Sequence, residues 1–241
     1  MLSVTKGIVL HHVKYGESSV IATIYTEKFG RQSYIVNSVR SRKARNKALL
    51  LQPLCLLELV AYQKQSRDVQ RLKELRLLKA FRSIPFDIKK SSQAIFIAEI
   101  LYKVLKEEES NPQMFRFLEQ AIAFLDLITE GTNNFHLYFL SRLTEFLGIS
   151  PNSGRLESGA WLDMEQGIAQ PFKPDHPKFM DKEETEVFLR LSKLELNKFQ
   201  EITVTKNLRK KLLVKILEYY QLHFDWVGRI KSLEVLNETF E

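Results

Sequence analysis

Apolar and polar residues alternate with a period of two along the first third of the chain. Combined with an enrichment in β-branched and aromatic residues, this alternation predicts β-strands. The predicted strands cover residues 7–14, 19–26, 32–39, 54–62 and 72–81, the last of which also fits a helix. The polar, basic residues 40–47 are predicted to be a loop. Five short strands with one long connection are typical of a small antiparallel barrel of the OB type.

From Pro85 onward the apolar positions recur with the 3.6-residue period of amphipathic helices. Asp181, with Glu184 three residues later, has the pattern of a capping box, and Gly148 is a typical C-terminal stop. Five helices are predicted. The first covers residues 91–109, with Ser91 or Ser92 as its cap, and the second covers residues 112–128. The third is capped by Asn133 or Asn134, the fourth is capped by Asp181, and the fifth covers residues 205–224.

These patterns together predict an α+β protein with two domains. Residues 1–82 are expected to form a basic OB-fold domain that binds nucleic acid, and residues 83–241 an all-α helical domain. Residues 149–178 contain four of the seven prolines and are expected to be an irregular insert in the helical domain.

The charge of the chain is unevenly distributed. Residues 1–82 contain 16 Lys and Arg residues against 5 Asp and Glu residues, a balance of +11, whereas the remainder carries 20 against 24, a balance of −4. Such an asymmetry between two halves indicates a polyanionic partner for the basic half. Net charge bears on association with partners and not on the fold.

The densest cationic run lies in the predicted loop at residues 40–47. A planar guanidinium group can bind two phosphate oxygens at once. The aromatic residues of the neighbouring strands are either core residues or, where exposed, platforms for unpaired bases; they are Tyr15, Tyr25, Phe29, Tyr34 and Tyr62. The residues predicted to bind DNA are Arg40, Arg42, Lys43, Arg45 and Lys47, supported by Arg31 and Lys14, with Tyr34 as a stacking candidate.

Motifs that indicate an enzyme or a metal site are missing from the sequence. It contains neither GxxxxGK[ST] nor GxGxxG, and its five histidines lack the spacing of a zinc site. The single cysteine, Cys55, has no partner for an internal disulfide and is predicted to be a small buried residue. No apolar stretch approaches the roughly 20 residues of a membrane helix. We therefore expect a cytoplasmic, non-enzymatic protein with no cofactor and no membrane partner, in preference to an undetected hydrolase.

Short motifs along nearly the whole chain resemble those of the bacterial DNA repair protein RecO family. They are Lys6-Gly-Ile-Val-Leu10, Tyr15-Gly-Glu-Ser-Ser19, Tyr25-Thr-Glu27 with Gly30, Leu51-Gln-Pro-Leu54, Phe139 with Leu143, Leu147-Gly148 with Pro151, and Lys231-Ser232 with Leu236. The resemblance implies an OB fold joined to a helical domain that binds single- and double-stranded DNA and anneals complementary strands. It also implies help in loading RecA onto strands coated with single-strand-binding protein. RecR and the acidic tail of single-strand-binding protein are the implied partners, and RecA an indirect one.

The sequence departs from the family pattern in one respect. Many family members carry four cysteines of a zinc module after the segment that matches Leu147-Gly148, whereas residues 149–178 contain none. Zinc is therefore not predicted. Packing around Trp161, Leu162, Ile168 and Phe172 is expected to replace it.

A second basic surface is predicted on the last long helix. An acidic tail with an apolar end needs an apolar groove with a cationic rim, and the residues that could supply this rim are Arg209, Lys210, Lys211 and Lys215, unless they are simply a solvated helix face. Two alternatives to DNA repair stay open. One is an RNA-binding OB protein, and the other is a protein-interaction adaptor whose charge is incidental.

Overall fold

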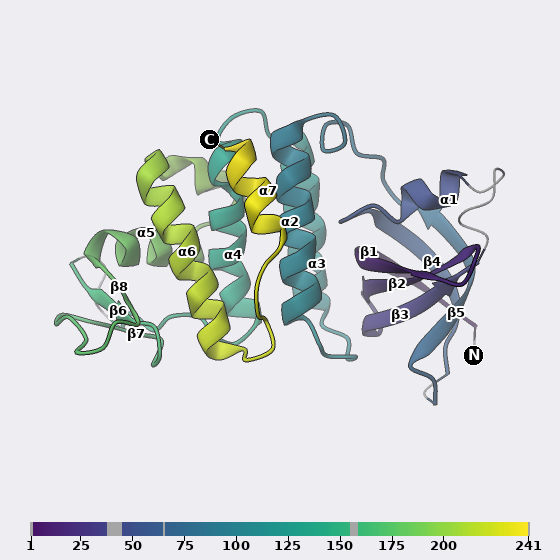
Figure 1. Cartoon of the computed structure of the whole chain (residues 1–241), viewed down its shortest axis with the longest axis horizontal. Helices are drawn as coiled ribbons and strands as arrows, with labels where there is room; N and C mark the ends of the chain where they lie inside the picture. Colours follow the sequence, from purple (N-terminus) through teal and green to yellow (C-terminus); the bar gives the residue numbers. More distant parts are fainter. Residues whose placement is uncertain (1, 38–44, 65, 155–158, 241) are drawn as a thin grey trace. The chain divides into compact units, whose positions relative to one another are not determined.

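The computed structural model describes the backbone of residues 2–37, 45–64, 66–154 and 159–240. The chain divides into two compact units (Figure 1). One unit comprises Met1–Leu127 and Ile230–Glu241, and the other comprises Ile128–Arg229. The predicted domain boundary after residue 82 falls inside the first unit, because helices that follow the barrel pack with it.

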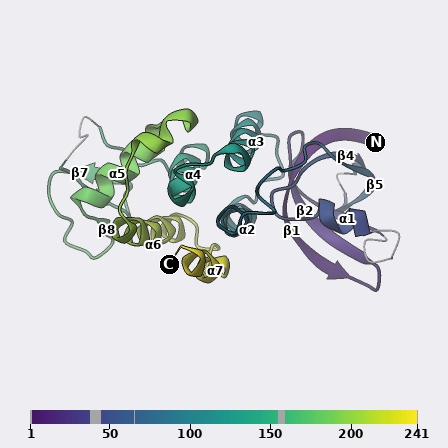
Figure 2. The same ribbon diagram turned by 90° about the horizontal axis from the view of Figure 1, so that it is seen from above.

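The first unit begins with a closed five-stranded barrel, as the sequence predicts. The strands are β1 (Leu2–Tyr15), β2 (Ser19–Thr26), β3 (Gly30–Val36), β4 (Leu56–Tyr62) and β5 (Val69–Leu77). They close in the order β1-β2-β3-β5-β4, and only the β3–β5 pair is parallel. This is an OB-like arrangement. Figure 2 shows the curved strands with helix α1 (Arg45–Leu50), which lies in the connection between β3 and β4.

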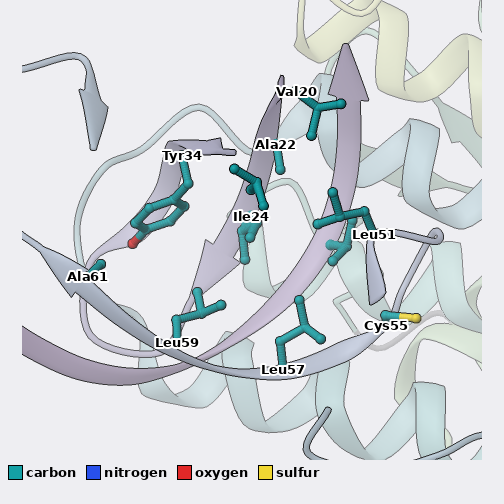
Figure 3. Close-up of a cluster of buried hydrophobic side chains, with 11 residues drawn as sticks. Val20, Ala22, Ile24, Tyr34, Leu51, Cys55, Leu57, Leu59 and Ala61 are labelled. Carbon is teal, nitrogen blue, oxygen red and sulfur yellow. The ribbon is translucent and has the colours of Figure 1, made fainter. Parts of the chain in front are cut away.

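The predicted alternation is seen in the burial of side chains. Residues of β3 are alternately buried and partly exposed, so every second side chain enters the core. Figure 3 shows Ile24, Tyr34, Leu57 and Leu59 meeting there, all fully buried. Cys55 is buried at the edge of this cluster, as predicted, and burial raises the pKa of its thiol to about 11.

Several predicted boundaries are wrong. β1 begins at Leu2 instead of residue 7, because it first pairs with β4 and then with β2. The predicted loop at residues 40–47 ends in helix α1, which starts at Arg45. β5 spans Val69–Leu77 instead of residues 72–81.

Three helices complete the first unit: α2 (Ile88–Val104), α3 (Pro112–Leu127) and α7 (Ser232–Thr239). The cap of α2 is Asp87, whose carboxylate accepts hydrogen bonds from the backbone N–H groups of Lys89 and Lys90; the predicted caps Ser91 and Ser92 lie inside the helix. A carboxylate placed before the helix in this way satisfies two of its otherwise unpaired donors.

Helix α7 lies beside α2 in both views (Figures 1 and 2). The Glu99 carboxylate of α2 accepts hydrogen bonds from the backbone N–H groups of Lys231 and Ser232 and from the Ser232 hydroxyl, at 2.6–2.9 Å. Burial disfavours the ionised carboxylate, but these hydrogen bonds outweigh it and lower the pKa of Glu99. The pair Lys231-Ser232 is therefore the point at which the C-terminal helix is attached.

The start of β3 holds the barrel against the end of α2. The Arg31 guanidinium donates to the carbonyl oxygens of Tyr102 (3.2 Å) and Leu105 (2.8 Å), which are at the C-terminal end of α2. Gly30 has a φ of +58°, and a Cβ there would lie 2.3 Å from the Glu109 carbonyl oxygen. Glycine is required at this position by both the left-handed backbone and the close approach.

Asp126, near the end of α3, fixes the segment that leaves the barrel. Its carboxylate accepts hydrogen bonds from the backbone N–H groups of Arg82, Ser83 and Ile84 at 2.8–3.0 Å. The Lys90 ammonium donates to the Asp126 carbonyl oxygen at 3.1 Å. Asp126 is only 2% exposed, so these groups form a buried joint between the barrel exit and the helices.

The second unit combines helices with a small sheet. Its elements are η2 (Thr132–Asn134), α4 (Phe135–Phe146), β6 (Trp161–Asp163), β7 (Ile168–Gln170), β8 (Phe179–Met180), α5 (Lys182–Lys193), η3 (Leu196–Glu201) and α6 (Lys206–His223). The predicted capping box of Asp181 and Glu184 is confirmed, with both reciprocal hydrogen bonds present. Gly148 lies just beyond the end of α4 and has a φ of +71°, as predicted for a C-terminal stop.

The predicted irregular insert contains β6 and β7, which form a three-stranded sheet with β8 just after the insert. The predicted packing cluster is wrong in part, because Ile168 and Phe172 are 42% and 76% exposed. Asp163 instead organises the turn: its carboxylate accepts from the N–H groups of Glu165 and Gln166 and contacts His176 Nε2 at 3.1 Å. Among the described residues, no group of three or more His, Cys, Asp or Glu side chains is placed to hold a metal ion.

Candidate nucleic-acid interface

A basic groove runs along β5 on the outside of the barrel. It consists of two adjoining hollows of about 510 and 410 Å³, both of which are lined by Arg71, Leu72 and Lys73. The first is completed by the end of β4 and the β4–β5 loop, and the second by the end of β3, helix α1 and the rest of β5. We define the cations of the basic groove as Lys47, Lys64, Arg67, Arg71, Lys73 and Arg76.

The strand register explains why the cations of β5 face solvent here. The β3–β5 ladder has three pairs in the part of the chain that the structure describes, and it ends at Ile35 and Arg71. Val60 pairs with Glu74 and Ala61 with Leu72, so Lys73 is the extra residue of a bulge. Bulges of this kind re-aim a side chain at the rim of a barrel. The side chains of Arg71 and Lys73 are therefore both exposed along the groove.

The groove has an excess of positive charge. Among its described lining residues the one acid is Glu74, which pairs with Arg76 at 2.9 Å. The other cations face solvent, where they attract a polyanion more than they stabilise the fold. Loops between strands 1 and 2 and between strands 4 and 5 are where OB barrels bind oligonucleotides. Lys64 and Arg67 lie in the second of these loops.

Lys47 is the one cation of the predicted basic loop whose side chain the structure describes, and it lines the groove. Arg40, Arg42 and Lys43 lie outside the described residues, as does the side chain of Arg45. Lys47 is exposed on α1, and its ammonium is 3.5 Å from the carbonyl oxygen of Asn37 at the groove. The contact of these cations with DNA stays a prediction.

Lys14 and Arg31, which are predicted to support the DNA contact, lie in different surroundings. Lys14 is exposed near the end of β1 and is not among the residues that line the groove. Arg31 is turned toward the end of α2, where it bonds two carbonyl oxygens and stacks on the Tyr102 ring at 4.7 Å. Arg31 therefore joins the barrel to α2, and its support of a DNA contact stays a prediction.

Tyr34 is fully buried in the barrel core, which overturns its prediction as a base-stacking residue. The alternation of β3 was recognised, but Tyr34 belongs to the inward set and its neighbours Ser33 and Ile35 to the partly exposed set. Burial also raises the pKa of Tyr34 far above its usual value.

We expect the variant Tyr34→Phe to be as stable as the parent protein or more stable by about 1 kcal/mol. Within the described residues the buried Tyr34 hydroxyl has no hydrogen-bond partner, and removing an unsatisfied hydroxyl removes its desolvation cost. Urea unfolding followed by circular dichroism measures the change. DNA affinity should be unaffected; a loss of affinity in a stable Tyr34→Phe protein would restore the original prediction.

The cations of β5 were missed by the sequence interpretation. The sequence does carry a signal, because Arg71 and Lys73 stand on either side of Leu72 with strand periodicity. The bulge at Lys73 interrupts that period, so the segment also resembled a helix. Lys47 lies in the same groove as the cations of residues 64–76 because the barrel closes. No local sequence pattern shows this closure.

The residues predicted to bind a partner lie on α6 of the second unit. Arg209 is half-buried and donates to Asn134 Oδ1 at 3.2 Å, and burial lowers the pKa of its guanidinium. Lys215 pairs with Glu218 at 3.3 Å, whereas Lys210 and Lys211 are exposed. A separate pocket of about 350 Å³ on α5 is lined by Leu189, Arg190, Lys193 and Leu194, and it combines apolar walls with two cations.

Comparisons with known proteins cover the whole chain. A family model described as recombination protein O N terminal matches residues 1–81, and one described as recombination protein O C terminal matches residues 85–234. A DNA repair protein RecO from Phocaeicola vulgatus is 38% identical over all of both chains, and one from Bacteroides fragilis is also 38% identical over all of both. That of Flavobacterium psychrophilum is 36% identical over 98% of each.

Proposed function

The chain belongs to the RecO family, which acts in DNA repair and recombination, and from this premise we propose that it is a non-enzymatic mediator in the cytoplasm. It binds single- and double-stranded DNA, anneals complementary strands and helps to load RecA onto strands coated by single-strand-binding protein. The observation that carries the proposal is the basic groove, where six cations line one side of an OB-like barrel.

Phosphate binding by the groove accounts for both kinds of DNA. Cations that neutralise phosphates release the counterions condensed on DNA, and this term does not depend on sequence. The exposed guanidinium groups of Arg67 and Arg71 can each bind two phosphate oxygens. No covalent step is needed, in agreement with the absence of phosphate-binding loop motifs from the sequence.

Annealing requires that two strands approach each other despite the repulsion between their phosphates. The groove supplies one cationic surface, and the run Arg40, Arg42, Lys43 and Arg45 is proposed to supply another next to Lys47. With charge neutralised on both strands, the barrier to base pairing falls. RecA loading then rests on partners, for which we propose RecR and the acidic tail of single-strand-binding protein.

The variant Arg42→Glu/Lys43→Glu/Arg45→Glu should lose most of the acceleration of annealing. Annealing of two complementary labelled oligonucleotides, followed by energy transfer, measures it. The fold should be intact, which a thermal melt checks. If the variant anneals strands as fast as the parent protein, the assignment of these three residues is wrong.

The tail of single-strand-binding protein is proposed to bind the second unit. An acidic peptide with an apolar end suits either the exposed Lys210 and Lys211 on α6 or the pocket beside Arg190 and Lys193 on α5. We expect Lys210→Glu/Lys211→Glu to weaken binding of a labelled tail peptide roughly tenfold, as for loss of two charge contacts. Equal affinity would reject α6, and the same titration of Arg190→Glu/Lys193→Glu then tests α5.

A further inference from the structure

One aromatic residue, Tyr62, lines the basic groove. It is the last residue of β4, and its side chain is 44% exposed in the hollow that Lys64, Arg67, Arg71 and Lys73 also line. A large, half-exposed ring among cations is not explained by core packing, because the barrel core is filled from the inward positions of the strands. Its position calls for a ligand that has both flat apolar surface and negative charge.

The register of the sheet shows what surrounds the ring. Tyr62 pairs directly with Leu2 of β1 on one side and with Arg71 of β5 on the other. Directly paired residues of antiparallel strands project from the same face, with Cβ atoms about 5 Å apart. Leu2 is 45% exposed and Arg71 is exposed. An apolar pair and a guanidinium therefore form one row across three strands.

We propose that Tyr62 is a base-stacking residue that makes the basic groove prefer a single strand over a duplex. The inference rests on the proposed DNA-binding function and adds the form of DNA that this groove takes. In a duplex the base faces are stacked on one another and only phosphates are offered to the groove. In a single strand a base face can cover Tyr62 and Leu2 while its phosphates reach Arg71 and Lys73. Stacking of this kind tolerates any base, since every base has a π-face.

The test measures affinities of the full-length protein for three ligands at one salt concentration. They are an oligothymidylate, an abasic strand of the same length with the same number of phosphates, and a duplex. The parent protein should bind the oligothymidylate roughly tenfold more tightly than the abasic strand. Tyr62→Ala should remove this tenfold preference and leave the affinities for the abasic strand and the duplex unchanged.

Two matched variants separate stacking from other effects. Tyr62→Phe keeps the ring and should bind like the parent protein, whereas Phe86→Ala removes a ring that is exposed (85%) outside the groove and should change nothing. Unchanged binding of the oligothymidylate by Tyr62→Ala, or an equal loss on all three ligands, would overturn the proposal while leaving the DNA-binding function standing. If the parent protein binds none of the ligands, the proposed function fails and the stacking role fails with it.

Discussion

Replacing Asp126 with alanine is expected to lower the free energy of unfolding by about 3 kcal/mol or more, because three backbone donors lose a buried, charged acceptor. The backbone N–H groups of Arg82, Ser83 and Ile84 all donate to this carboxylate, and no alanine atom can accept from them. Urea unfolding followed by far-ultraviolet circular dichroism measures the change. Asp126→Asn is the matched control: it keeps one acceptor oxygen without the charge and should lose less. An ordinary neutral hydrogen bond contributes about 1 kcal/mol. A smaller loss in Asp126→Ala would show that the three hydrogen bonds of the Asp126 carboxylate contribute little to stability.

The same residue gives the stability a defined pH dependence. Burial disfavours the ionised carboxylate of Asp126, but the hydrogen bonds from Arg82, Ser83 and Ile84 and the charge of Lys90 outweigh it and lower its pKa. The group therefore binds a proton more readily in the unfolded chain, where its pKa is about 3.9. Its stabilising contribution is complete above that value and is lost as the pH falls through the folded-state pKa. The difference in stability between the parent protein and Asp126→Asn should shrink below about pH 4.

Reversing two charges in the basic groove is expected to weaken single-stranded DNA binding roughly 10- to 100-fold at low salt. In Arg71→Glu/Lys73→Glu, two cations that are proposed to contact phosphate become repulsive. The slope of log affinity against log salt concentration should become shallower by about 1.4, since each phosphate contact contributes about 0.7. Because both side chains are exposed, the free energy of unfolding should change little. Fluorescence anisotropy of a labelled oligonucleotide measures both quantities.

The control for this variant is Lys89→Glu/Arg116→Glu. It changes the net charge by the same amount at two exposed positions on α2 and α3. If both double variants weaken binding equally, the effect comes from net charge and the groove has no special role. Comparison with the variant of residues 42, 43 and 45 then shows whether the groove or the basic run at residues 40–47 dominates.

Much of the fold was predictable because its local signals are strong and agree with one another. Residues 19–26 were predicted as a strand with the bounds that the structure has, since turn signals around Gly16 and Gly30 bound them on both sides. The Asp181–Glu184 capping box was predicted because its hydrogen bonds join residues only three positions apart. The closed barrel followed from the number of strands and their turns.

What could not be predicted depends on contacts between distant residues. Alternation alone does not say which set of β3 side chains faces inward, and so Tyr34 was assigned to the surface. Arg31 looked like a free cation, although its partners, the carbonyl oxygens of Tyr102 and Leu105, are more than 70 positions away. The Asp87 cap was missed in favour of Ser91 and Ser92, because all three residue types cap helices well.

The basic groove was predictable from the sequence only in part. Its cations come from α1, the β4–β5 loop and β5, which barrel closure brings to one face. The uneven charge of the sequence predicts a polyanionic partner for this half of the chain. The dense cationic run then led to the prediction that the binding residues lie at residues 40–47. The structure adds Arg71 and Lys73, of which Lys73 is the extra residue of a bulge that the sequence pattern concealed.

Binding of a fluorescent single-stranded oligonucleotide to the full-length protein, titrated over a series of salt concentrations, tests the central claim most directly. The account predicts tight binding at low salt that weakens steeply, with a log–log slope of roughly −3 to −4 if most of the six groove cations contact phosphate. The same titration with RNA of equal sequence should give no tighter binding. Absence of binding at low salt would contradict the account and would favour a protein-interaction adaptor whose basic barrel serves a protein partner.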